Sequence, residues 1–258
     1  MHNEHYKSEY TTDFVSRWDD LIGWEGRQKA ENGFFENILK KHGCNYVCDN
    51  AAGTGYHAIT LAQQGFKAVA TDGARTMVEK IKENAKRLNV KLEGAETVEW
   101  ADLDTHYGAE HFDAHLCLGN AFTHLFEHEA RLESLKAMFR SLKPGGVLAL
   151  DHRNYDSILD NGFSTKHQYY YTGDEVDARP VEISDTACLF EYSYADGSKY
   201  HLNMFPLRQK YVRDLLAEAG FEQIQTFGDF KASFNDDEVD FFQQIAVKPG
   251  KLNSNARG

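Results

Sequence analysis

Short apolar runs alternate with longer amphipathic segments between residues 46 and 151. The runs have the length of buried strands, and the segments between them repeat apolar residues at helical spacing. We expect strands at 46–49, 68–72, 97–100, 112–118 and 147–151, and helices at 57–64, 76–88 and 129–142. This alternation predicts a parallel sheet with helices on both faces.

The segments on either side of this region show other patterns. Apolar residues at helical spacing predict a helical N-terminal segment over residues 1–43. The alternation breaks after residue 154, where Asp196-Gly197 is a hairpin turn signal between two expected strands, at 189–194 and 199–204. We therefore expect residues 155–206 to form an inserted antiparallel lid.

The α/β pattern resumes after the insertion. A helix is expected at 209–219, and two strands at 221–227 and 241–247, without a helix between them, indicate an antiparallel edge. The main domain would then consist of residues 44–154 and 207–248. The polar residues 249–258 are expected to be a disordered tail.

The composition disfavours several classes of protein. The formal net charge of −12 disfavours nucleic acid as a partner. No apolar run is long enough for a membrane span, and the first residues do not resemble a secretory signal. The four scattered cysteines are expected to be reduced thiols in a cytoplasmic protein, and the dispersed histidines give no support for a metal site.

A glycine loop, Gly53-Thr54-Gly55, follows the first expected strand. Glycine allows a tight turn and a close approach of the backbone to a ligand. Asp72 ends the second expected strand, where an acid would meet ribose hydroxyls. This arrangement is shared by NAD-dependent enzymes and by methyltransferases that use S-adenosylmethionine.

Asp49 favours the second class. It lies four residues before Gly53, and its carboxylate would repel a pyrophosphate but attract the ammonium group of S-adenosylmethionine. A NAD-dependent oxidoreductase and a non-catalytic protein that binds S-adenosylmethionine remain the alternatives.

Several segments narrow the class further: 117–125 (CLGNAFTHL), 151–156 (DHRNYD), 228–231 (GDFK), Arg17-Trp18 and the glycine loop. With them, the chain resembles the glycine N-methyltransferase family, and within it the microbial glycine/sarcosine N-methyltransferases of betaine synthesis. The resemblance covers residues 10–247. It implies a class I methyltransferase fold, which is a Rossmann-like α/β fold with a seven-stranded, mostly parallel sheet, here with the inserted antiparallel lid.

The resemblance also implies which residues hold S-adenosylmethionine. Tyr10 and Trp18 match aromatic residues over the cofactor, and Arg27 matches an arginine that pairs with its carboxylate. Asp102 and Leu103 match the pair that binds adenine. The remaining cofactor positions are Asp49, Ala51, Gly53, Thr54, Gly55, Asp72, Leu118 and His124.

The substrate residues implied by the resemblance are Asn120, Arg153, Tyr171 and Tyr192. A guanidinium can hold a carboxylate through two parallel hydrogen bonds, which suits Arg153 for this role. The sequence contains no clear general base, and His124 is the one candidate. The expected reactions are glycine to sarcosine and sarcosine to dimethylglycine, with another small amino acid or dimethylglycine as alternative substrates. With only nine residues before Tyr10, a monomer is expected.

Overall fold

A seven-stranded sheet forms the centre of the computed structural model, which describes residues 5–164 and 176–250. The strands are ordered β3-β2-β1-β4-β5-β10-β9. Their bounds are β1 Tyr46–Asp49, β2 Lys67–Asp72, β3 Gly94–Thr97, β4 Phe112–Cys117, β5 Leu142–Arg153, β9 Glu222–Gly228 and β10 Phe241–Val247. β10 pairs antiparallel with both β5 and β9, whereas the other pairings are parallel. The mostly parallel sheet is confirmed, with the reversed strand one place inside the edge.

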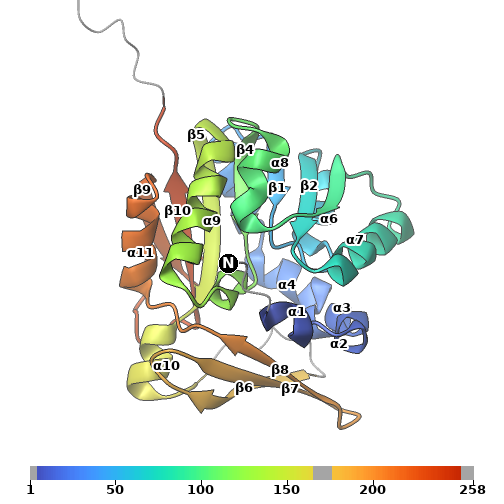
Figure 1. Cartoon of the computed structure of the whole chain (residues 1–258), viewed down its shortest axis with the longest axis vertical. Coiled ribbons are helices and arrows are strands. Elements are labelled where there is room, and N and C mark those ends of the chain that lie inside the picture. Colours follow the sequence, from blue (N-terminus) through green and yellow to red (C-terminus); the bar gives the residue numbers. More distant parts are fainter. Residues whose placement is uncertain (1–4, 165–175, 251–258) are drawn as a thin grey trace, which may run out of the picture.

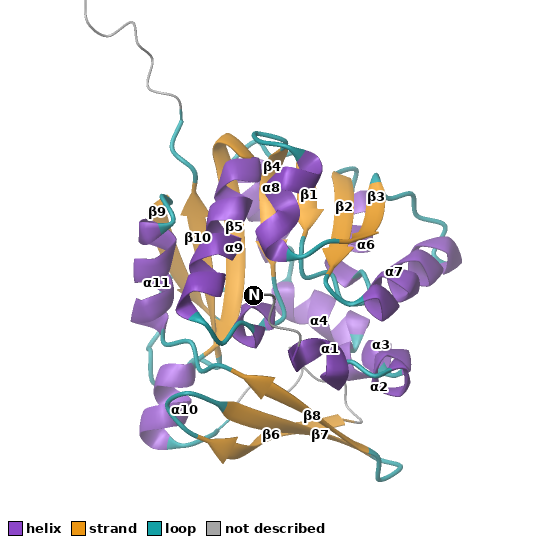
Figure 2. Ribbon diagram, viewed as in Figure 1, coloured by secondary structure: helices purple, strands orange, loops and turns teal. Residues whose placement is uncertain are grey.

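Helices cover both faces of this sheet (Figure 2). One face packs against α5 (Phe34–Lys41), α6 (Tyr56–Gln63) and α7 (Arg75–Arg87), and the other against α8 (Leu103–Tyr107), α9 (His128–Ser141) and α11 (Gln209–Glu218). Successive side chains of a strand point to opposite faces. In β1, Val47 accordingly packs on the face covered by α5–α7, and Cys48 packs on the face covered by α8, α9 and α11. This alternation explains why the central strands are apolar throughout.

The N-terminal segment forms four short helices: α1 His5–Glu9, α2 Thr12–Ser16, α3 Trp18–Ile22 and α4 Trp24–Glu31. Gly23, with φ of 59°, ends α3 in the left-handed region. Figure 1 shows α1–α3 at the lower edge of the sheet, where the parallel strands end, next to the small sheet. The Glu9 carboxylate accepts two hydrogen bonds from Asn203, which ties α1 to that sheet.

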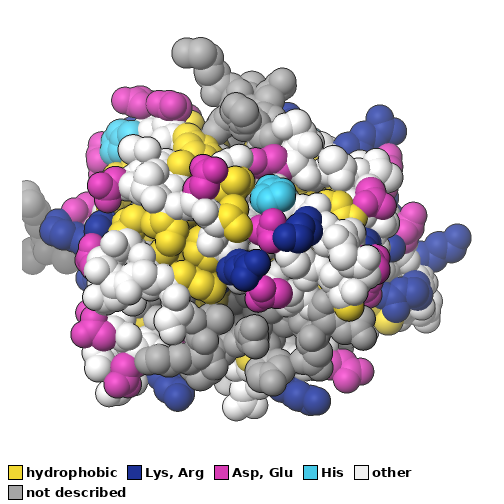
Figure 3. Space-filling view, turned by 90° about the horizontal axis from the view of Figure 1, so that it is seen from below, with side chains coloured by type: hydrophobic (Ala, Val, Ile, Leu, Met, Phe, Trp, Pro, Cys, Tyr) yellow, Lys and Arg dark blue, Asp and Glu magenta, His cyan; other side chains and the backbone are white. Residues whose placement is uncertain are grey.

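The insertion contains a three-stranded antiparallel sheet, as expected, ordered β6-β7-β8. Its strands are β6 Val176–Ile183, β7 Cys188–Tyr194 and β8 Lys199–Met204; β6 and the preceding helix α10 (Tyr155–Asn161) were not expected. Seen from below, acidic, basic and histidine side chains lie next to one another beside an apolar area (Figure 3). On the small sheet, Glu191 pairs with Lys199 at 2.8 Å and His201 at 3.2 Å.

Two strand expectations were wrong in their bounds. β3 spans Gly94–Thr97 instead of 97–100, and the short 3-10 helix η1 (Trp100–Asp102) follows it. β5 begins at Leu142 instead of residue 147, because the backbone of Gly145 and Gly146 pairs with Lys248. Because β3 ends three residues earlier than expected, the residues that follow it differ in their position relative to the cleft described below.

The described ranges contain no helix that is both long and apolar enough to cross a membrane. The four cysteines are buried free thiols. Within the same ranges, no three His, Cys, Asp or Glu side chains are grouped so as to hold a metal ion.

Candidate active site

A cleft lies at the carboxyl ends of the parallel strands and is lined by residues of the sheet loops, the N-terminal helices and the small sheet. Its position is the switch point of the sheet, where the chain turns from β1 toward β2 and β3 on one side and toward β4 and β5 on the other. Open α/β sheets bind ligands there. The expected residues on its wall are Tyr10, Trp18, Arg27, Ala51, Gly53, Asp72, Leu118, Asn120, His124, Arg153 and Tyr192.

The glycine loop is fixed by Asp72. Its two carboxylate oxygens accept hydrogen bonds from the backbone N–H groups of Gly53 and Ala74, each at 2.9 Å. Burial raises the pKa of Asp72 to about 7, although these two hydrogen bonds oppose the shift. The carboxylate therefore both shapes the loop and faces the cleft.

Asp49, Thr54 and Gly55 support the loop from behind and are absent from the cleft wall. The Asp49 side chain is 1% exposed and accepts a hydrogen bond from the Ala58 N–H at 3.1 Å, which fixes the first turn of α6. Burial raises the pKa of Asp49 to about 6, against the opposing charges of His57 and Arg27.

Asp19 joins the N-terminal helices to the loop. Its carboxylate accepts hydrogen bonds from the Thr54 hydroxyl, from Trp24 Nε1 at 3.2 Å and from Asn84 Nδ2 at 3.0 Å. Thr54 and Asn84 lie 35 and 65 residues away in the sequence, so no local pattern could have indicated these two contacts. Asp19 thus fixes α3, which carries Trp18, against the glycine loop.

An aromatic group closes the cleft on the side of the N-terminal helices. The rings of Tyr10 and Trp18 lie 5.1 Å apart between centroids, and the Tyr10 hydroxyl lies 2.8 Å from His124 Nε2. Burial lowers the pKa of His124 to about 4, so the imidazole is neutral near pH 7. The neutral ring can accept a hydrogen bond from the Tyr10 hydroxyl at Nε2, which makes His124 a partner of the aromatic group.

Arg153 also lies on the cleft wall, as the last residue of β5. Its guanidinium lies between the rings of Phe190 and Phe241, 4.7 and 4.9 Å from their centroids. Burial raises the pKa of Tyr192, while the charge of Arg153 and its hydrogen bond to the Tyr192 side chain oppose the shift. Arg153 and Tyr192 therefore form one polar unit in an apolar surrounding.

Asn120 stabilises the position of Arg153 through hydrogen bonds. Its Oδ1 accepts a hydrogen bond from the Arg153 backbone N–H at 3.0 Å, and its Nδ2 lies 2.9 Å from both the Tyr155 hydroxyl and Met204 Sδ. The amide is thus engaged within the protein, and the geometry favours a positioning role for Asn120 over direct contact with a substrate. Tyr171 lies outside the described residues.

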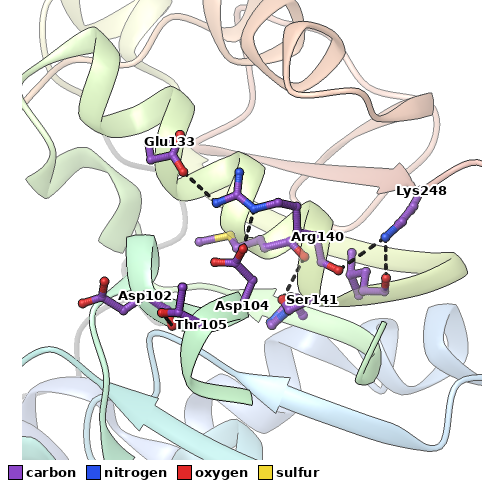
Figure 4. Close-up of polar contacts among 10 residues, drawn as sticks. Asp102, Asp104, Thr105, Glu133, Arg140, Ser141 and Lys248 are labelled. Atoms are coloured by element: carbon purple, nitrogen blue, oxygen red, sulfur yellow. Dashed lines mark hydrogen bonds and ion pairs between the residues drawn. The ribbon is translucent and has the colours of Figure 1, made fainter. Parts of the chain in front are cut away.

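The cleft wall does not include Asp102 and Leu103. Asp102 is exposed, and its carbonyl accepts a hydrogen bond from the Thr105 hydroxyl at 2.9 Å. Figure 4 shows the Asp102 carboxylate pointing away from Arg140, whose partners are Asp104 and Glu133. Leu103 is fully buried in the core.

Glu99 and Trp100 line the cleft, whereas Asp102 and Leu103 do not. Both lie three residues earlier, the same offset by which β3 was misplaced. Trp100 Nε1 donates a hydrogen bond to the Asn50 carbonyl at 2.6 Å, and the Tyr6 hydroxyl donates to the Glu99 carboxylate at 3.0–3.1 Å. An aromatic ring and a carboxylate therefore line the end of the cleft near Asp72.

Comparisons with known proteins agree with this arrangement. Residues 47–146 match the family model described as a methyltransferase domain. The glycine/sarcosine N-methyltransferase of Aphanothece halophytica is 46% identical over 246 residues, which cover 95% of this chain and 92% of that protein. This chain belongs to the glycine/sarcosine N-methyltransferase family.

More distant matches show how far the family and its fold extend. The glycine N-methyltransferase of Rattus norvegicus is 32% identical, with 83% of each chain covered. The crystal structure of an S-adenosylmethionine-dependent methyltransferase from Clostridium acetobutylicum matches with a TM-score of 0.71 at 16% identity, covering 92% of this chain and 98% of that one. The fold is therefore confirmed as that of class I methyltransferases.

Proposed function

We propose that the chain transfers methyl groups from S-adenosylmethionine to the nitrogen of glycine, giving sarcosine, and then to sarcosine, giving dimethylglycine for betaine synthesis. The observation that carries this proposal is the position of Arg153. A buried guanidinium beside Tyr192 lies in the same cleft as the glycine loop and Asp72. A small carboxylate-bearing amine and a nucleoside-bearing cofactor would then meet in one cavity.

The residues on the cleft wall fit S-adenosylmethionine. Asp72 is suited to ribose hydroxyls, Trp100 to the flat adenine ring and Arg27 to the carboxylate. The buried acid Asp49 near the loop disfavours the pyrophosphate of NAD, because like charges repel. These features support a methyltransferase over the oxidoreductase alternative.

Bound S-adenosylmethionine would supply a methyl group already activated by a positive sulfur, so the protein mainly has to position the reactants. Arg153 would hold the substrate carboxylate and Asn120 would keep Arg153 in place. Leu21, Leu202 and Met204 give the cleft an apolar wall, which disfavours a charged ammonium and favours the neutral amine that attacks. As the new N–C bond forms, the C–S bond breaks, and the amine proton leaves to solvent.

His124 is assigned to the cofactor side and not to proton transfer. Its neutral ring faces Tyr10, and their hydrogen bond occupies Nε2. We propose that substrate amines enter the site deprotonated and that no residue acts as a dedicated general base. We also propose that the protein is a cytoplasmic monomer, which light scattering during gel filtration would test.

The proposal is tested by incubating the purified protein with S-adenosylmethionine and glycine, sarcosine or dimethylglycine, with products resolved by mass spectrometry. Sarcosine and dimethylglycine are expected from glycine. Arg153→Ala should lose at least 90% of the turnover, whereas the control Arg75→Ala, at an exposed position of α7, should keep it. Full activity of Arg153→Ala would refute the carboxylate clamp. Tight binding of NAD, measured by isothermal titration, would favour the oxidoreductase.

A further inference from the structure

Four buried charged or titratable side chains gather at one end of the cleft: Arg27 and Glu31 from α4, Asp49 from β1 and His57 from α6. Each is at most 7% exposed. Arg27 and His57 line the cleft, while Glu31 and Asp49 lie behind them. The function proposed above gives no role to Glu31 or His57. Burying these groups is costly unless they have partners or a use.

Glu31 fixes the orientation of His57. The distance between His57 Nε2 and Glu31 Oε1 is 2.7 Å, and the rings of Phe35 and Tyr56 pack edge-on against the imidazole. Because an ionised carboxylate only accepts hydrogen bonds, Nε2 carries the proton of this contact. The other ring nitrogen, Nδ1, has no hydrogen-bond partner among the described residues, and it belongs to a side chain on the cleft wall.

The surroundings favour a positive charge on His57. Burial lowers the pKa of His57, but the carboxylates of Glu31 and Asp49 more than offset burial and the charge of Arg27, so the net pKa is raised. The imidazole also lies in the first turn of α6, directly after the glycine loop. Helix N-termini favour anions, because their N–H groups point outward and the helix dipole is positive there.

We propose that His57, oriented by Glu31, binds the carboxylate of the cofactor's methionine part together with Arg27. This inference rests on the proposed function, because it assumes a ligand whose amino acid part lies at this end of the cleft. The other end is lined by the acids Asp72 and Glu99, which disfavour a carboxylate. Arg153 is assigned to the substrate. Arg27 and His57 are therefore the positions where a ligand carboxylate is attracted.

Two variants separate the role of the charge from that of the shape. His57→Gln keeps a donor for Glu31 but removes the positive charge. Glu31→Gln keeps the packing but removes the carboxylate that retains the proton on His57. A matched control is His106→Gln, which alters a similar pair, His106 with Glu96 at 2.5 Å, on the exposed surface.

The experiment compares two ligands by isothermal titration: S-adenosylhomocysteine, and 5′-methylthioadenosine, which lacks the amino acid part. His57→Gln should weaken binding of S-adenosylhomocysteine by roughly tenfold or more, as expected for the loss of one charge-assisted hydrogen bond. Its binding of 5′-methylthioadenosine should change less than about twofold, within ordinary variation. The control should bind both ligands like the wild type. Equal losses for both ligands would overturn the proposal, because they would indicate a structural role.

The wild type gives a readout that does not depend on how the variants fold. Its preference for S-adenosylhomocysteine over 5′-methylthioadenosine should fall as the pH rises through the raised pKa of His57, and in Glu31→Gln this fall should occur at lower pH. A preference of the wild type that does not change with pH would overturn the assignment. If the wild type makes sarcosine and His57→Gln loses affinity for both ligands equally, only this inference is refuted. Ligand preference without sarcosine formation would refute only the proposed function.

Discussion

Gly53 is the position where one added methyl group should affect the cleft most directly. Its φ is +55°, in the left-handed region, and a Cβ there would lie 3.2 Å from Trp18 Nε1 and 3.8 Å from Trp18 Cδ1. Trp18 rests against Tyr10 and Phe14, with 5.1 Å between ring centroids in each pair. In Gly53→Ala, we therefore expect the indole to shift and to disturb this aromatic group.

The expected effects have two parts. A side chain in the left-handed region costs about 1–2 kcal/mol, which corresponds to a decrease in Tm of roughly 2–8 °C for a domain of this size. Trp18 is expected to lie over the cofactor, so displacing it should remove one aromatic contact with the ligand, worth about 0.5–1.5 kcal/mol, or roughly two- to twelvefold in the Kd of S-adenosylhomocysteine.

Gly43→Ala separates the two parts. Gly43 has a φ of +67°, but a Cβ there would have no heavy atom within 4 Å. Both variants should lose similar stability in thermal unfolding, and Gly53→Ala alone should bind S-adenosylhomocysteine more weakly in isothermal titration. Equal Kd values in the two variants would refute the contact between the glycine loop and Trp18 as the cause.

Three further outcomes are expected. Asp19→Ala removes an acceptor of three side-chain hydrogen bonds and should lower the free energy of unfolding in urea by about 1–3 kcal/mol; an unchanged value would contradict its bridging role. Trp100→Ala should weaken binding of S-adenosylhomocysteine without changing the KM for glycine, and a change in that KM alone would argue against an adenine contact. Because burial raises the pKa of Asp49 to about 6, its carboxylate is protonated below that pH; in His57→Gln, which removes the opposing titration of the imidazole, affinity for S-adenosylhomocysteine should fall between pH 7 and pH 5, and a flat profile there would exclude a role for the charge of Asp49.

The sequence pattern was sufficient for the central strands because their burial makes them apolar. β1 and β10 have the expected bounds. β3, with the sequence Gly-Ala-Glu-Thr, is partly exposed and has no apolar run, so its expected position was three residues late. β6 is an edge strand with many exposed positions, and the same weakness of pattern explains why it was not expected.

The cleft was predictable where a residue follows a recognisable strand or motif, as Gly53, Asp72 and Arg153 do. It was not predictable where the contact joins distant segments. Glu31 and His57 are 26 residues apart, and their pairing depends on how α4 packs against α6. Asn120 could be located from its motif, but its engagement with Tyr155 and Met204 required the tertiary structure.

The position of β10 has a consequence for biosynthesis. β10 is the last strand in the described part of the chain, yet it lies between β5 and β9, and its Phe241 pairs with Arg153. A ribosome adds roughly 5–20 residues per second, so Arg153 is synthesised several seconds before the strand that positions its guanidinium. The nascent chain cannot complete the substrate end of the cleft until its final strand has emerged, and a nascent chain that stalls before residue 241 would leave the edge of β5 open to aggregation.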